Sequence, residues 1–188
     1  MKWIEVNIGV PSDVVNCKSI LKDFVSPFVE ENMDTYSCWH YLWERKPWPE
    51  IEGEGVTLLL RFYGEDEMMD GLKDELEQKL TQLHCERPEN CLGHCFGAHG
   101  ECGDEYVGEA NTWGEIPWEY GMKFFQIGSE YALDLLRNEE KLGRSDEYKE
   151  DAYYYADRYV HCFLNQMAML VNEVGFLHQQ YLSRRSQR

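Results

Sequence analysis

The sequence predicts an α+β fold, with a small antiparallel sheet that packs against helices and is followed by a C-terminal helical region. Three observations lead to this class. Residues 2–10 alternate apolar and polar side chains, and residues 56–63 are apolar on both faces, as strands are. The segments that follow them repeat apolar residues every three or four positions, as helices do. Glycine and proline separate these segments, as they do at turns.

The first strand is predicted over residues 2–10, where alternate apolar residues share one face: Ile4, Val6, Ile8 and Val10. Pro11 interrupts this pattern, and Ser12 is the expected N-cap of a helix over about residues 13–29. Pro27 is expected to kink or end that helix, because proline lacks a backbone N–H and clashes with the preceding turn.

Two further strands and a second helix extend this order. Residues 36–44 are rich in aromatic side chains and residues 56–63 in apolar ones, and both predict strands. Residues 46–55, with two prolines and two glycines, predict the loop between them. Residues 65–84 have helical spacing. This order predicts an antiparallel ferredoxin-like β-α-β-β-α-β core, whose last strand we assign to residues 105–110.

The rest of the chain is predicted to form helices over about residues 119–137 and 146–181. We therefore expect a single domain spanning residues 1–188. It would consist of an α+β core over residues 1–111 and C-terminal helices over residues 112–188.

The formal net charge of −17 argues against nucleic acid and anionic membranes as partners, because such a surface repels phosphate. The expected partner is instead a peptide or small ligand, and a basic one suits this charge best. No apolar run approaches the roughly 20 residues that span a bilayer. No targeting signal precedes the first strand, which predicts a cytoplasmic protein. The seven cysteines are then expected to be reduced.

Cysteine, histidine and glycine are concentrated between residues 85 and 104, a segment without periodicity that is expected to be a loop. Thiolate and imidazole ligands favour zinc over magnesium or calcium. If a metal binds, we expect zinc, held by four of six residues: Cys85, Cys91, His94, Cys95, His99 and Cys102. Their spacing fits no zinc-finger pattern, so a loop with inert thiols is the alternative.

Arg61 is a cation within the apolar strand predicted over residues 56–63. A guanidinium on a sheet face can hold a carboxylate through two parallel hydrogen bonds. A solvated sheet face, or a salt bridge to one of the many acidic residues, is the alternative interpretation.

The aromatic side chains of residues 36–44 share one strand face: Trp39, Tyr41 and Trp43. This face either binds a peptide or packs in the core, and aromatic stripes at strand spacing favour the core. The sequence contains none of the common nucleotide-binding, metalloprotease or serine hydrolase motifs.

Two segments resemble one known family. The strand ending Leu60-Arg61-Phe62, and the stretch from Glu115 to Leu136, resemble the C-terminal, thiopeptide-type domain of lantibiotic dehydratases, which also occurs as a stand-alone protein. The resemblance implies an elimination domain, which removes glutamate from glutamylated Ser or Thr of a precursor peptide or performs a related step. It also implies that Arg61 grips the glutamyl carboxylate. The family often has a second arginine where this sequence has Leu59.

Three functions therefore remain open at the level of sequence. The protein is a peptide-tailoring enzyme, a non-catalytic peptide-binding module of the same fold, or a small zinc-binding protein of unrelated function.

Overall fold

The computed structural model describes residues 1–44 and 55–138. The chain divides into two compact units, Met1–Arg137 and Asn138–Arg188, and the description below concerns the first. The helix predicted over residues 146–181 lies outside the described residues, and so does nearly all of the loop predicted over residues 46–55.

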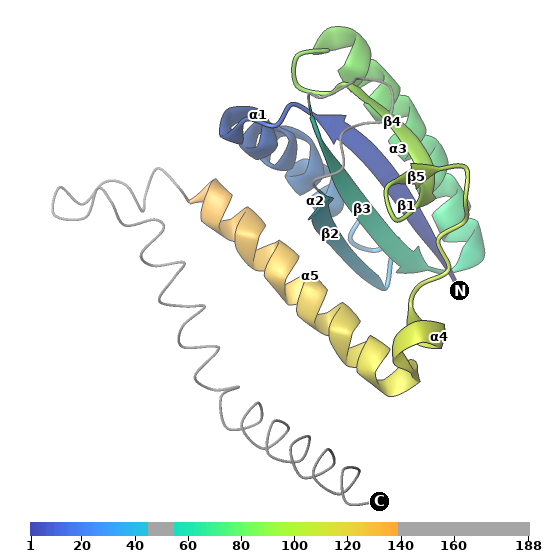
Figure 1. Cartoon of the computed structure of the whole chain (residues 1–188). Helices are drawn as coiled ribbons and strands as arrows, with labels where there is room; N and C mark the ends of the chain where they lie inside the picture. The colour runs from blue at the N-terminus through green and yellow to red at the C-terminus, as the bar shows by residue number, and fades with distance from the viewer. Residues whose placement is uncertain (45–54, 139–188) are drawn as a thin grey trace, which may run out of the picture. The chain divides into compact units, whose positions relative to one another are not determined.

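A five-stranded sheet forms the centre of the first unit (Figure 1). Its strands are β1 (Lys2–Val10), β2 (Cys38–Glu44), β3 (Val56–Gly64), β4 (Gly93–Ala98) and β5 (Glu101–Cys102). Their spatial order is β2-β3-β1-β4-β5, and every neighbouring pair is antiparallel. This structure confirms the α+β class, the antiparallel sheet and the first three predicted strands. The prediction succeeds for these strands because their apolar residues form the buried face of the sheet.

The prediction of the fourth strand at residues 105–110 is wrong. That strand is β4, Gly93–Ala98, and it pairs with β1 inside the segment expected to be a loop. Two of its residues are glycines, so the alternation that marks a strand in sequence is missing. Gly97 is required there, because a Cβ atom at this position would overlap the backbone carbonyl of Glu101 on β5.

Six helical segments surround the sheet: α1 (Val14–Ser19), the π-helical η1 (Ile20–Val25), α2 (Ser26–Glu31), α3 (Asp66–Glu86), α4 (Ala110–Trp113) and α5 (Glu115–Arg137), counted over the described residues. The N-cap of α1 is Asp13 rather than the expected Ser12, since the Asn16 amide donates to Asp13 Oδ1 at 2.9 Å. Pro27 does not end the helical run: it lies in the first turn of α2, directly after the π-helical η1.

The main core lies between one face of the sheet and the segments η1, α2 and α3. It contains the predicted apolar face of β1 and the matching residues of β3: Leu58, Leu60 and Phe62. Helix α5 runs beside β2, where Ser129 accepts a hydrogen bond from the Tyr41 amide at 3.1 Å (Figure 1). The first half of α5 also packs on the other face of the sheet through Trp118 and Phe125.

Candidate functional site

A buried ion pair lies at the centre of the second sheet face. Glu5 on β1 and Arg61 on β3 are directly opposed, and Arg61 Nε donates to Glu5 Oε2 at 2.6 Å. The side chains are 0% and 2% exposed. Burying an ion pair is costly unless hydrogen bonds also satisfy the remaining polar atoms of both side chains. Glu5 and Arg61 therefore need partners in addition to each other.

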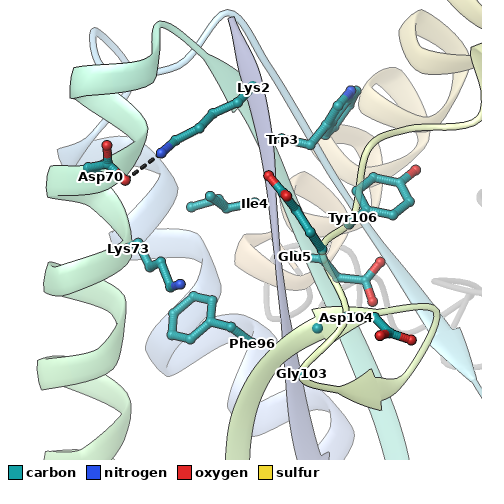
Figure 2. A pocket seen from close by; sticks show the side chains of 12 residues that line it. Lys2, Trp3, Ile4, Glu5, Asp70, Lys73, Phe96, Gly103, Asp104 and Tyr106 are labelled. Atoms are coloured by element: carbon teal, nitrogen blue, oxygen red, sulfur yellow. Dashed lines mark hydrogen bonds and ion pairs between the residues drawn. The ribbon is translucent and has the colours of Figure 1, made fainter.

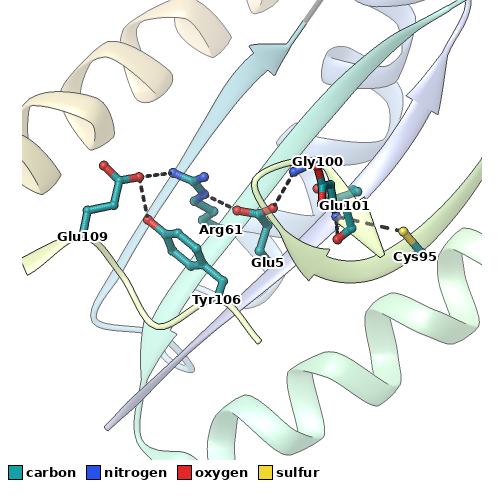
Figure 3. Close-up of polar contacts among 8 residues, drawn as sticks. Glu5, Arg61, Cys95, Gly100, Glu101, Tyr106 and Glu109 are labelled. Carbon is teal, nitrogen blue, oxygen red and sulfur yellow. Dashed lines mark hydrogen bonds and ion pairs between the residues drawn. The ribbon is translucent and has the colours of Figure 1, made fainter. Parts of the chain in front are cut away.

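The guanidinium of Arg61 has two more neighbours, both from the segment before α4 (Figure 3). It lies over the ring of Tyr106, 4.0 Å from the ring centroid. Arg61 Nη1 is also 3.5 Å from Glu109 Oε1, and the Tyr106 hydroxyl is 3.5 Å from the same oxygen. Burial raises the pKa of Tyr106, so this hydroxyl remains a donor. Glu109 is therefore a second, more distant carboxylate on the arginine.

The turn between β4 and β5 holds the other end of Glu5. The Gly100 amide donates to Glu5 Oε1 at 3.2 Å, and Asn7 Nδ2 donates to the Glu101 carbonyl at 3.2 Å. Gly100 has φ = +80°, a conformation that glycine adopts readily. The β4–β5 turn thus orients the carboxylate that orients Arg61.

His40 on β2 is the third polar residue of this buried row, directly opposite Arg61. Its ring stacks on Phe125, with centroids 5.2 Å apart, and meets the edge of Trp3 at 5.8 Å. Neither ring nitrogen has a hydrogen-bond partner among residues 1–44 and 55–138. Burial, together with the nearby Arg61 charge, lowers the pKa of His40 to about 3. The imidazole is therefore neutral at physiological pH.

Two pockets flank Tyr106 and open this region to the surface. The first, of about 350 Å³, reaches Glu5 and lies between β1, α3 and the segment after β5 (Figure 2). Lys2 and Asp70 form an ion pair at its rim. The second pocket, of about 420 Å³, is lined by two charged residues, Lys2 and Glu105, and otherwise mainly by aromatic and apolar side chains: Trp3, Tyr63, Tyr106, Val107, Trp118 and Met122. Two of the three neighbours of the guanidinium, Glu5 and Tyr106, thus border the first pocket, and Tyr106 also borders the second, whereas Arg61 itself lines neither.

The six predicted metal ligands are spread along the chain. Cys85 is exposed near the end of α3, and Cys91 is buried before β4. His94 and Cys95 are neighbours on β4, His99 lies in the β4–β5 turn, and Cys102 is on β5. Across the described part of the chain, no three His, Cys, Asp or Glu side chains are grouped to hold a metal ion. The zinc site stays a prediction, without support from this geometry.

The expectation that all cysteines are reduced is wrong for one pair, because Cys95 and Cys102 form a disulfide. The two residues lie on paired strands with Cα atoms 5.6 Å apart, a separation that suits a disulfide. The sequence did not indicate this pairing, because the strands that bring the cysteines together were not recognised.

The aromatic face of β2 packs as core, in agreement with the favoured interpretation. Trp39 is 2% exposed in the main core, and Tyr41 and Trp43 pack against it. None of the described helices is long and apolar enough to cross a membrane.

The sequence reasoning missed four residues of the site: Glu5, His40, Tyr106 and Glu109. The alternation of residues 2–10 puts Glu5 on the face opposite Ile4, Val6 and Ile8, and this is the face that also carries Arg61. An acid and a base on matching faces of predicted strands could have signalled the pair. Tyr106 and Glu109 come from irregular backbone, for which no periodicity exists.

Comparison with known proteins shows the fold. No protein family model matches the sequence, and no curated protein matches it. Among solved structures, the tRNA dependent lantibiotic dehydratase MibB from Microbispora sp. 107891 is similar, with 24% identity and a TM-score of 0.57. The similarity covers 78% of this chain but only 12% of MibB. TsrL is 18% identical with a TM-score of 0.39, over 77% of this chain and 36% of TsrL. The expected resemblance to lantibiotic dehydratases is thus confirmed at the level of the fold.

Proposed function

We propose that this protein binds a peptide and takes part in its tailoring, with Arg61 holding a carboxylate of the bound peptide. The fold is shared with part of a tRNA dependent lantibiotic dehydratase. This chain spans about an eighth of that protein. The shared fold therefore supports a peptide as the ligand, and the proposed elimination of glutamate has to be measured directly.

The observation that carries the proposal is the unequal bonding of Arg61. Its Nε donates to Glu5 at 2.6 Å, whereas Glu109 is 3.5 Å from Nη1 and 20% exposed. A contact of that length is at the limit of a hydrogen bond and is weak. The carboxylate of a ligand can therefore take the position of Glu109 on the guanidinium.

This exchange leaves the electrostatic balance of the buried region unchanged. One carboxylate leaves Arg61 as another arrives, and Glu109 swings into water from a side chain that is already partly exposed. A buried site that gained an anion without losing one would suffer a desolvation cost of several kcal/mol. The arrangement thus favours ligands with one negative group at this position.

The rest of the peptide is expected to lie over the two pockets beside Tyr106. The aromatic pocket with Trp3 and Trp118 suits an apolar side chain. The net charge of −17 favours basic residues elsewhere in the peptide and should make association weaker at high salt.

We also propose that the core be classed as ferredoxin-like. The order of its elements, strand, helix, strand, strand, helix and strand, is that of the split β-α-β unit. The antiparallel strand order β2-β3-β1-β4 supports this assignment, with β5 as an addition at one edge.

Titration calorimetry with a synthetic peptide tests the function. One peptide carries a glutamyl group, esterified to serine, with a free carboxylate, and its control carries the corresponding amide. We expect the carboxylate form to bind at least about tenfold tighter, since a charge-assisted bond contributes about 1.5–3 kcal/mol. Equal binding of both peptides, or binding of neither, would refute the role of Arg61. Mass spectrometry of the same mixtures records whether glutamate is eliminated.

A further inference from the structure

The guanidinium of Arg61 is separated from the two pockets that flank Tyr106. Arg61 is 2% exposed and lines neither pocket, whereas Lys2, Trp3, Glu105 and Tyr106 line both. The ring of Tyr106 is therefore part of the wall that the pockets share, and it covers the guanidinium, which lies 4.0 Å from the ring centroid (Figure 3). The position of this ring thus decides whether a ligand in either pocket reaches Arg61.

Tyr106 belongs to a segment that few other contacts hold in place. We call residues 104–108 the strap. Its backbone forms no hydrogen bond with any of the described residues, and Asp104, Glu105 and Val107 are exposed. Tyr106, which is 3% exposed, is the one buried side chain of the strap. Segments with few buried contacts and a solvent-exposed backbone open locally at a low cost in free energy.

The two ends of the strap, in contrast, are held by the rest of the structure. Before it, the Cys95–Cys102 disulfide joins β5 to β4, and the Gly103 amide donates to a carbonyl of β4 at 2.9 Å. Shortly after it, helix α4 begins. Gly103 and Gly108 flank Tyr106 and have φ of +95° and +79°, and a Cβ atom at Gly103 would meet nothing within 4 Å. Glycine adopts many backbone conformations, so these two positions suit hinges.

We propose that the strap opens and closes over Arg61, and that a peptide binds the open form, in which the two pockets join into one groove with the guanidinium at its floor. This inference rests on the proposed binding of a carboxylate to Arg61. The joined groove extends to both sides of the guanidinium, so it fits a carboxylate on an internal residue of a peptide better than a free amino acid. Glu5 stays on Arg61 in both forms, so the buried ion pair is kept.

Chemical modification of arginine tests the opening of the strap without any ligand. Phenylglyoxal reacts with guanidinium groups that it can reach, and mass spectrometry of proteolytic fragments of the full chain gives the rate at each arginine. Arg87 is the internal reference, because its side chain is 52% exposed. Arg61 should react at least about tenfold more slowly than Arg87, because only the open form of the strap exposes it. Equal rates at Arg61 and Arg87 would overturn the proposal.

Two variants should increase the rate at Arg61. Tyr106→Ala should raise it at least about tenfold, because it removes a desolvated cation–π contact. Gly103→Ala keeps the buried ring and should raise the rate as well, because a side chain at φ = +95° strains the closed strap. Tyr120→Ala, the same change at a tyrosine that is 66% exposed on α5, should leave the rate unchanged. Circular dichroism shows which variants are folded, and an unaltered rate at Arg61 in either folded strap variant overturns the proposal.

The glutamyl peptide separates this inference from the proposed function. It should protect Arg61 from phenylglyoxal at a concentration at least about tenfold below that of free glutamate, because its contacts in both pockets offset the cost of opening the strap. Equal protection by the two ligands would overturn the joined groove. Faster modification in the strap variants without protection by the peptide would support the opening and refute the proposed function. Protection by the peptide without faster modification in those variants would do the reverse.

Discussion

Glu5 and Arg61 face each other from adjacent antiparallel strands, and the two side chains that make this 2.6 Å contact are 0% and 2% exposed. Removing one member of such a pair leaves the other as an uncompensated buried charge. We expect Glu5→Gln to lower the free energy of unfolding by about 3–5 kcal/mol. Urea denaturation followed by circular dichroism measures this value.

The neutral double variant Glu5→Gln, Arg61→Met should recover part of that loss, because no buried charge remains. Glu31→Gln is the matched control, since it removes one carboxylate from an exposed contact with Lys79 of 2.7 Å. It should cost less than about 1 kcal/mol. An equal decrease in the free energy of unfolding for Glu5→Gln and Glu31→Gln would show that the buried ion pair contributes no more to stability than the exposed one.

His40 predicts a pH dependence of stability. Its pKa is about 3 in the folded chain and 6.5 in ordinary surroundings. Between these pH values the unfolded chain binds a proton at His40 that the folded chain does not bind. The contribution of the neutral, buried His40 to the free energy of unfolding is therefore complete above about pH 6.5 and decreases as the pH drops towards 3. The slope from this group approaches 1.4 kcal/mol per pH unit at most.

The variant His40→Phe should flatten this slope, because an apolar ring next to Phe125 and Trp3 has no proton to bind. Unfolding by urea at pH 4, 5, 6 and 7 checks it, with Thr81→Ala on the exposed side of α3 as a control. An unchanged slope in His40→Phe would mean that other groups dominate the acid sensitivity.

Glu109 predicts a gain of binding if the proposed function is right. Glu109→Gln removes the carboxylate that competes for Arg61, so the glutamyl peptide should bind several-fold more tightly than to the unchanged protein. Glu89→Gln, which alters an exposed acid between α3 and β4 that lines neither pocket, should give no comparable gain. Weaker binding in Glu109→Gln would show that Glu109 contacts the ligand instead of giving way to it.

The disulfide predicts that the β4–β5 turn is sensitive to reduction. Cys95–Cys102 closes a short loop, for which we expect a contribution of about 2 kcal/mol to stability. Hydrogen exchange at the Gly100 amide, which donates to Glu5, should accelerate after reduction or in Cys95→Ser. Unaltered exchange would mean that Asn7 and the strand pairing hold the turn alone.

The same disulfide bears on the zinc prediction. Cys95 and Cys102 are bonded to each other, and no three His, Cys, Asp or Glu side chains of the described residues are grouped to hold a metal ion, so the oxidised protein, purified without a histidine tag, should contain less than about a tenth of an equivalent of zinc. Metal analysis before and after reduction checks this. One equivalent of zinc in the reduced protein would support the site predicted from sequence.

The parts of the fold with strong periodicity could be predicted from sequence, and the irregular parts could not. Strands β1 and β3 and helix α3 have regular apolar patterns that correspond to buried faces. Strand β4 contains Gly93 and Gly97, which have no side chain to bury, so its sequence lacks the apolar–polar alternation that predicts a strand. In the site, Arg61 stood out as a cation in an apolar strand, whereas its partners Tyr106 and Glu109 come from backbone without a repeat.

The Ser129 hydroxyl on α5 has a consequence for how this protein behaves at high concentration. It accepts from the Tyr41 amide at 3.1 Å and donates to the Phe125 carbonyl at 2.8 Å, so this outward N–H of β2 is already satisfied. An aromatic strand at the edge of a sheet is otherwise a template on which other chains add strands and aggregate. Because α5 bonds this N–H through the Ser129 side chain, one of the groups by which another strand would pair with β2 is already occupied, and we expect strand addition at this edge of the described sheet to be disfavoured.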